Sequence, residues 1–164
     1  MSKSSDFKND SNELLQLVSF KIGNEEFGIN ILIVQEIIKT VQITKIPNAP
    51  VFVEGIINLR GKVIPVIDLR VKLNLEKKVQ DKDTRIIVLE INSKTIGFIV
   101  DEVNEVLRIP KSITEPPPDM VTGLNSEFIT AVGKLDDRLI TLIDLEKVLS
   151  TDEKIQLTNN IESA

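Results

Sequence analysis

Two aspartates, Asp68 and Asp144, are the residues of this sequence that most resemble a catalytic pair. Each lies near the end of an apolar run, VIPVIDL at 63–69 and LITLIDL at 139–145. Two carboxylates that symmetry brings together can share one proton, as in pseudo-symmetric acid hydrolases. Such a site needs a small hydroxyl residue and a glycine after each aspartate, but leucine follows both here. We therefore favour the simpler interpretation, in which each aspartate ends a strand and accepts hydrogen bonds from nearby backbone N–H groups.

Other motifs that could bind a phosphate group or a metal do not match the known patterns in full. The segment GIINLRGKV, residues 55–63, resembles a phosphate-binding loop but has five residues between its glycines, and valine follows its lysine. The acidic pair in DKD, residues 81–83, is typical of a solvated loop rather than a metal site. The chain has no histidine and no cysteine, which removes the commonest general base and all thiolate chemistry. The sequence thus predicts no catalytic residues, no metal and no cofactor.

The composition is that of a soluble β-rich protein. Of 164 residues, 41% are hydrophobic and only 4% aromatic, and isoleucine and valine dominate the apolar set. The net charge of -5 argues against a nucleic-acid partner, whose phosphates attract basic proteins. No apolar run reaches about 18 residues and the N-terminal segment has no apolar signal region, so we expect no membrane insertion. The absence of cysteine fits the cytoplasm.

An internal repeat organises the elements that position these residues. Residues 20–37, FKIGNEEFGINILIVQEI, align without a gap on residues 89–106, LEINSKTIGFIVDEVNEV, at a shift of 69. The two aspartates are 76 residues apart, so the second copy has about seven extra residues, which we assign to KSITEPPPDMVTG at 111–123. The ordered matches indicate a duplicated unit.

Each half contains short strands and tight turns. The strand patterns predict four hairpins, which turn at Gly23-Asn24, at Arg60-Gly61-Lys62, at 92–94 and near Asp136-Asp137. Such a pattern is typical of an all-β fold of small barrels or a sandwich. The halves should pack together, because each alone would bury too little surface.

Outside the strands, three segments have other signals. Asn48 is expected to cap a short turn through residues 49–52, and Ser150 with Glu153 forms a capping box before a weak C-terminal helix. We expect a flexible tail at 1–13, one domain at 14–150 with sub-barrels near 14–82 and 83–150 that exchange terminal strands, and a helix or tail at 151–164.

Two charged residues have no evident role in a core. Glu36 interrupts the apolar run ILIVQEII, and Arg60 lies at the tip of a glycine turn. Each is either a solvated charge or a contact for a partner, since arginine is enriched at interface hot spots. The apolar residues that recur in both halves either belong to the core or line a groove between the halves; they are Ile31, Val34, Ile37, Val103 and Val106.

In its order of motifs the chain resembles the CheW family of bacterial chemotaxis coupling proteins. The carriers of the resemblance are FGI and VQEI at 27–37, GIINLRGKVIPVIDLR at 55–70, IGFIVDEVNEVL at 96–107 and VGKLDDRLITLIDLEKVL at 132–149. The resemblance implies two five-stranded SH3-like barrels about a pseudo-two-fold axis, with short helical segments. It also implies a cytoplasmic adaptor without enzymatic activity, recruited to receptor arrays, that joins chemoreceptor tips to the regulatory domain of the histidine kinase CheA.

The resemblance further implies site residues. Those for the helical receptor tip are Val34, Glu36, Gly55, Arg60, Gly61, Gly97, Val103 and Val106. For the kinase we expect Ile43, Pro47 and Phe52. The alternative is an SH3-like regulatory module that binds another signalling kinase outside chemotaxis.

Overall fold

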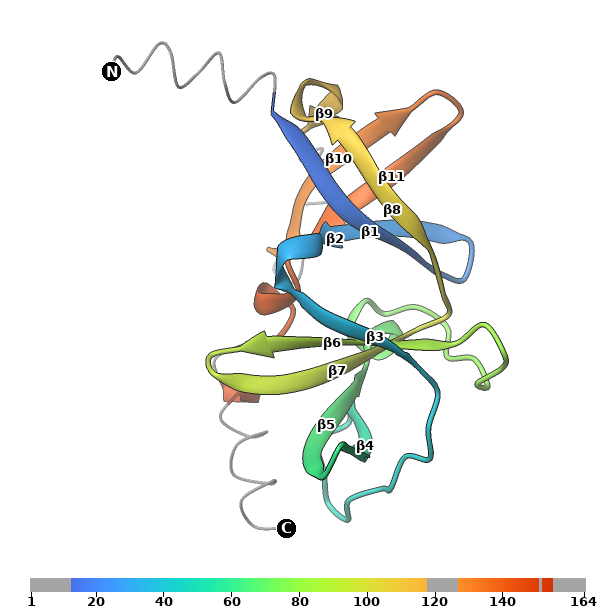
Figure 1. Ribbon diagram of the computed structural model, residues 1–164, viewed down its shortest axis with the longest axis vertical. Coiled ribbons are helices and arrows are strands. Elements are labelled where there is room, and N and C mark those ends of the chain that lie inside the picture. The colour runs from blue at the N-terminus through green and yellow to red at the C-terminus, as the bar shows by residue number, and fades with distance from the viewer. Residues whose placement is uncertain (1–12, 118–126, 151, 155–164) are drawn as a thin grey trace.

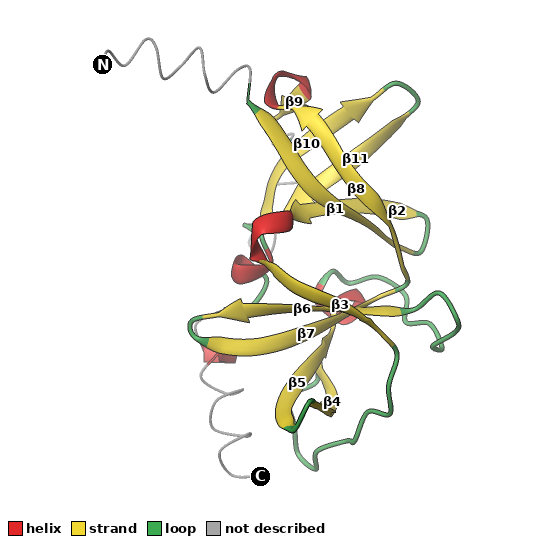
Figure 2. Cartoon of the chain, in the orientation of Figure 1, coloured by secondary structure: helices red, strands yellow, loops and turns green. Residues whose placement is uncertain are grey.

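The computed structural model describes residues 13–117, 127–150 and 152–154, and most of its elements are strands (Figures 1 and 2). One sheet contains six strands, β1 (Leu14–Ile22), β2 (Glu25–Asn30), β8 (Glu102–Pro110), β9 (Thr114–Glu115), β10 (Ile129–Leu135) and β11 (Arg138–Ile143). The other contains five, β3 (Val34–Lys39), β4 (Val53–Leu59), β5 (Lys62–Asp68), β6 (Arg85–Ile91) and β7 (Lys94–Val100). The expected tail before residue 13, most of the expected C-terminal segment and part of the proline-containing loop lie outside the described residues.

The four predicted hairpins are confirmed. Strands β1 and β2, β4 and β5, β6 and β7, and β10 and β11 are antiparallel pairs. The tight turn between β6 and β7 uses Asn92 and Ser93, whose φ angles of 51° and 65° are left-handed. Positive φ at both central residues gives a two-residue turn the twist that matches its flanking strands.

The strand register confirms the internal repeat. Val66 of β5 pairs in parallel with Gly97 of β7, and the equivalent Leu142 of β11 pairs in parallel with Gly28 of β2. The register shift between Val53 and Gly55 in β4 also recurs in β10, between Ile129 and Ala131. The expected fold of two small curled sheets from a duplicated sequence is therefore correct, and the short β9 adds a sixth strand to one of them.

The two sheets exchange strands between the repeats. The six-stranded sheet has the order β8-β1-β2-β11-β10-β9, and the five-stranded sheet has the order β3-β6-β7-β5-β4. Each sheet thus combines the first two strands of one repeat with the later strands of the other. The chain passes between the sheets at η1 (Ile31–Ile33) and again at Asp101, between β7 and β8. These segments occupy equivalent places in the two repeats.

The apolar residues form three clusters. One small cluster is built from strands of the five-stranded sheet and includes Ile64, Val66 and Ile86, and another, from the six-stranded sheet, includes Leu17 and Ile140. The largest cluster draws on both sheets and lies between them; it includes Phe20, Ile29, Ile87, Leu89, Phe98 and Leu145. β-branched residues suit this arrangement because both faces of strands such as β6 are buried.

Short helical turns follow the last strand of each repeat. Asp68 precedes α2 (Leu69–Lys72), and Asp144 precedes η4 (Leu145–Lys147). The predicted capping box is confirmed, since Glu153 Oε1 accepts from Ser150 N at 2.9 Å and Ser150 Oγ accepts from Glu153 N at 3.1 Å. The expected capping by Asn48 is wrong, because its φ of 62° is left-handed whereas a cap residue has extended backbone.

Candidate protein-binding site

Glu36 and Arg60 form a two-pronged ion pair on the surface of the five-stranded sheet. Arg60 Nη2 donates to Glu36 Oε1 at 2.8 Å, and Nη1 donates to Oε2. The arginine side chain is 72% exposed and the glutamate 27%. The hydrogen bond from Arg60 lowers the pKa of Glu36, and the same bond raises the pKa of Arg60. The sequence singled out both residues, and the structure brings them together.

The hairpin turn between β4 and β5 holds Arg60 in place. Arg60 and Gly61 have φ angles of 52° and 84°, and Gly61 N donates to Asn58 Oδ1 at 2.8 Å. Glycine suits the second position, where a side chain would be strained. Arg60 itself occupies a left-handed conformation that is uncommon for a residue with a side chain. The turn and the ion pair together fix the direction of the guanidinium group.

The apolar residues expected at the receptor contact lie on the edge strands β3 and β8, which occupy equivalent ends of their sheets. Val34 and Val103 are half-buried and pack on the large cluster between the sheets. Further along the same strands, the equivalent residues Ile37 and Val106 are 38% and 53% exposed. The sequence left open whether these residues belong to the core or to a surface groove. In the structure Val34 and Val103 support the core, and Ile37 and Val106 are exposed.

Gly55 and Gly97 are buried, and a larger residue at either would collide with its surroundings. A Cβ atom at Gly97 would lie 2.7 Å from Ile86 Cγ2, inside the smaller core of the five-stranded sheet. A Cβ atom at Gly55 would collide with the carbonyl oxygen of Thr44. Gly97 therefore allows β7 to approach β5 and β6, and Gly55 allows β4 to approach the segment at Thr44.

The three residues expected at a kinase contact have different environments. Pro47 is exposed, and Ile43 is half-buried against the smaller core of the five-stranded sheet. Phe52 is buried in the large cluster, and Lys72 Nζ lies 5.1 Å from the centre of its ring. Of the three, Pro47 offers the most surface to another protein.

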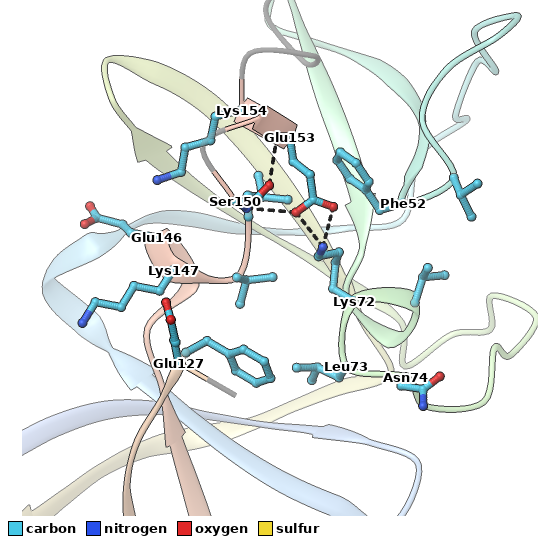
Figure 3. A pocket seen from close by; sticks show the side chains of 15 residues that line it. Phe52, Lys72, Leu73, Asn74, Glu127, Glu146, Lys147, Ser150, Glu153 and Lys154 are labelled. Carbon is cyan, nitrogen blue, oxygen red and sulfur yellow. Dashed lines mark hydrogen bonds and ion pairs between the residues drawn. The ribbon is translucent and has the colours of Figure 1, made fainter. Parts of the chain in front are cut away.

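A hollow of about 1030 Å³ lies beside Phe52 and Lys72, and Figure 3 shows the side chains that line it. Lys72 Nζ donates to both carboxylate oxygens of Glu153, at 2.7 and 2.6 Å. Partial burial acts to raise the pKa of Glu153, but the hydrogen bonds from Lys72 and Ser150 outweigh it and the pKa lies below its ordinary value. Because the charged groups at its centre satisfy one another, we place no ligand there.

The two strand-end aspartates accept hydrogen bonds from nearby backbone N–H groups, as the sequence predicted, and each also caps a short helical turn. Asp68 Oδ1 accepts from Arg70 N at 3.0 Å, and Asp144 Oδ1 accepts from Glu146 N at 3.0 Å. Asp68 is also bound by the buried side chain of Arg70, through Nε at 2.9 Å and Nη2 at 3.2 Å. A carboxylate held by a guanidinium on both oxygens is not arranged to share a proton with another carboxylate.

Sequence reasoning missed that Arg70 belongs to a buried charged cluster. Its Nη1 atom donates to Asp101 Oδ1 at 3.0 Å and to the Lys78 carbonyl oxygen at 2.7 Å. Burial acts to lower the pKa of Arg70, but the bonds and charges of Asp68 and Asp101 raise it overall. The signal in the sequence is the charge of Asp101 at a place where the other repeat has Leu32.

Within the described ranges, no three acidic side chains gather as a metal site would require. In the same part of the chain, no helix has the length and apolarity to cross a membrane. Among the candidate residues, the Glu36–Arg60 ion pair is exposed, and so are Ile37 on edge strand β3 and Val106 on edge strand β8.

Comparison with known proteins agrees with this description. Residues 16–153 match the CheW-like domain family. The chain is 40% identical to chemotaxis protein CheW of Klebsiella aerogenes, over 90% of this chain and 89% of that protein. It is 39% identical to chemotaxis protein CheW of Helicobacter pylori, over 87% and 86%.

A solved structure is also similar. The crystal structure of the scaffolding protein TtCheW from Thermoanaerobacter tengcongensis superposes with a TM-score of 0.78 at 42% sequence identity. The match covers 86% of this chain and 96% of that one. The family match, the relatives and the fold agree, and the chain belongs to the family of proteins with a CheW-like domain.

Proposed function

We propose that this chain is a non-enzymatic adaptor of bacterial chemotaxis, which joins the cytoplasmic tips of chemoreceptors to the histidine kinase CheA. Membership of the CheW-like family supports this proposal, as do relatives named chemotaxis proteins and a scaffolding protein of the same fold. The observation that carries it is the Glu36–Arg60 pair, fixed on an exposed hairpin beside the edge strand β3. An adaptor needs such rigid contact surfaces and no reacting group.

The proposed receptor surface combines polar and apolar contacts. Glu36 and Ile37 are neighbours on β3 and point to opposite faces of the strand, so an amphipathic helix would lie along its edge, with its polar groups toward the Glu36–Arg60 pair and its apolar side toward Ile37. Val106 would offer the equivalent apolar contact on the edge of β8. Because the pair is already formed, little side-chain freedom is lost when a partner binds.

The proposed kinase surface centres on the segment before β4, which packs against Gly55 of the proposed receptor set. It includes the exposed Pro47 and the outer part of Ile43. Phe52 would act from below, by supporting this segment from the core. With one surface for each partner, the adaptor would hold both at once and be recruited to membrane-associated arrays by the receptor.

Calorimetric titration with a helical hairpin from a chemoreceptor tip tests the proposal. Calorimetry suits this chain because it has no tryptophan or tyrosine for fluorescence. We expect wild-type binding with a dissociation constant on the order of micromolar, about -8 kcal/mol. The Arg60→Glu variant should lose binding and remain folded, because the side chain is mostly exposed.

Lys94→Glu is the matched control. It makes the same change of charge at an exposed position of another hairpin in the same sheet, and it should bind as the wild type does. If both variants bind normally, the receptor surface lies elsewhere. If the wild type does not bind, the proposed receptor contact fails, and a kinase outside chemotaxis becomes the partner to test.

A further inference from the structure

The buried cluster of Asp68, Arg70 and Asp101 lies where the chain crosses between the two sheets. Their exposed fractions are 1%, 2% and 6%. Asp101 is the residue between β7 of the five-stranded sheet and β8 of the six-stranded sheet, and Asp68 and Arg70 come from the end of β5 and from α2. The cluster therefore belongs to the junction of the two sheets rather than to either interior.

The two carboxylate oxygens of Asp101 bind opposite sides of this junction. Oδ1 accepts from Arg70 Nη1 at 3.0 Å, on the side of the five-stranded sheet. Oδ2 accepts from Gly23 N at 2.6 Å, in the β1–β2 turn of the six-stranded sheet. The backbone N–H of Asp101 also donates to the Lys21 carbonyl oxygen at 3.0 Å. One side chain thus ties both sheets together.

The equivalent crossover lacks this connection. Leu32 occupies the place of Asp101 in the other repeat and is 86% exposed, and its backbone N–H donates to Asn30 Oδ1 at 2.9 Å. In place of Arg70 the other repeat has Glu146. Among the residues that the structure describes, the crossover at Asp101 is joined by a charged side chain to the opposite sheet, and the one at Leu32 is not.

We propose that the Asp68–Arg70–Asp101 cluster is a clamp that sets the angle between the two sheets and so aligns the two edges of the receptor surface. The apolar cluster between the sheets stabilises their contact, but apolar burial is non-directional. Charged hydrogen bonds have fixed geometry, and buried ion pairs often contribute specificity more than stability.

The clamp lies at the base of both proposed receptor-contact elements. Strand β8, which carries Val106, begins directly after Asp101, and the hairpin that carries Arg60 ends at Asp68. A change in the clamp should therefore alter how these contacts are placed relative to each other. In this respect the inference rests on the proposed receptor function, and the three residues are positioning residues.

The Asp101→Asn variant tests the clamp. An asparagine side chain has one acceptor oxygen where aspartate has two. At position 101 that oxygen can accept from Gly23 N or from Arg70, but not from both. The position equivalent to Asp101 is Leu32, so the control is Asp144→Asn, which makes the same change of side chain at the counterpart of Asp68, where no arginine side chain of the described residues binds.

The angle between the sheets is measured by pulsed electron paramagnetic resonance. Because the chain has no cysteine, nitroxide labels attach only to Val63→Cys on β5 and Leu139→Cys on β11, which are equivalent and exposed. We expect one narrow distance distribution for the wild type and the Asp144→Asn control. Asp101→Asn should shift or broaden it and weaken receptor-tip binding about five-fold or more, as is typical of coupling between sites.

A role in stability alone would lower the unfolding midpoint but leave the distance distribution of the folded molecules unchanged, and that result would overturn the proposal. Arg70→Lys provides a second variant, because an ammonium group keeps the charge but lacks the planar fork that bridges two carboxylates. If both variants fail to fold, the cluster is a requirement for folding and the proposal is overturned.

The distance measurement needs no receptor. If the wild type fails to bind the tip, the proposed receptor function fails, and the clamp is judged from the label distances alone. If binding weakens with unchanged distances, the clamp fails while the receptor function stands.

Discussion

Replacement of Gly97 by alanine should destabilise the protein through crowding in the core of the five-stranded sheet. The new Cβ atom would lie 2.7 Å from Ile86 Cγ2 and 3.6 Å from Val66 Cγ2. Non-bonded carbon atoms prefer about 3.5–4.0 Å, so either Ile86 or strand β7 must move by about 1 Å. Overpacking of this kind costs about 1–3 kcal/mol.

The equivalent Gly28 provides the matched comparison. A Cβ atom there would lie 3.1 Å from Ile140, 3.2 Å from Leu142 and 3.4 Å from Leu17, and each of these contacts is with the end of a leucine or isoleucine side chain. Small rotations of those side chains relieve the overlap. Gly28→Ala should therefore cost clearly less than Gly97→Ala.

Urea denaturation followed by far-ultraviolet circular dichroism measures these costs. With a slope of about 2 kcal/mol per molar urea, a cost of about 2 kcal/mol lowers the midpoint by about 1 M. The double variant with Ile86→Ala removes the colliding methyl group. Its loss of stability should be smaller than the sum of the two single losses by about 0.5–3 kcal/mol.

Two results would refute this reasoning. Strictly additive losses would show that Gly97 and Ile86 do not collide. Weaker receptor-tip binding by fully folded Gly97→Ala, with stability unchanged, would show that the glycine contacts the partner directly. Otherwise its role is to let β7 approach β5 and β6, and any effect on binding follows the loss of folded protein.

Three further predictions follow from the charges and the topology. Asp68→Asn should cost about 3–5 kcal/mol in urea denaturation because it leaves a buried guanidinium poorly paired, whereas Asp144→Asn, with no such partner, should cost much less; equal losses would contradict this. The lowered pKa of Glu153 means that the stabilisation from this carboxylate is complete above its ordinary pKa of 4.5 and is lost as the pH falls through the folded-state value. Glu153→Gln should thus reduce the fall in melting temperature between about pH 5 and about pH 3, and an unchanged fall would contradict it. Fragments 1–82 and 83–164 should be unfolded alone by circular dichroism and form β structure when mixed, because each sheet takes strands from both; a folded single fragment would refute this.

Local features were readable from the sequence because they depend on neighbours along the chain. The turns at Gly23 and Arg60, the capping box at Ser150 and the caps at the strand-end aspartates all involve residues within a few positions of one another. Glu36 and Arg60 were each singled out because a charged residue stands at a place with no evident role in the core. Their contact with each other was seen in the structure.

The sequence allowed the strand exchange but did not require it. Both repeats have the same local pattern, so their strands could pair within a repeat or between repeats. The contact between Arg70 and Asp101 joins residues 31 positions apart, and no periodicity in the sequence connects them. Gly97 looked like a contact residue in the family pattern, but its environment depends on how closely β5 and β6 approach it.

The position of the two crossovers has a consequence for the order in which the protein forms during synthesis. Strands β3 to β7 are consecutive, so the five-stranded sheet is complete as soon as residue 100 has left the ribosome. Strands β1 and β2 emerge first but must wait for β8, β10 and β11 before their sheet can close. Until then the apolar residues of β1, which are Leu17, Val18, Phe20 and Ile22, lack the neighbours that β8 and β11 supply. The nascent chain thus carries a hydrophobic hairpin with two open edges, the kind of segment that chaperones protect from aggregation.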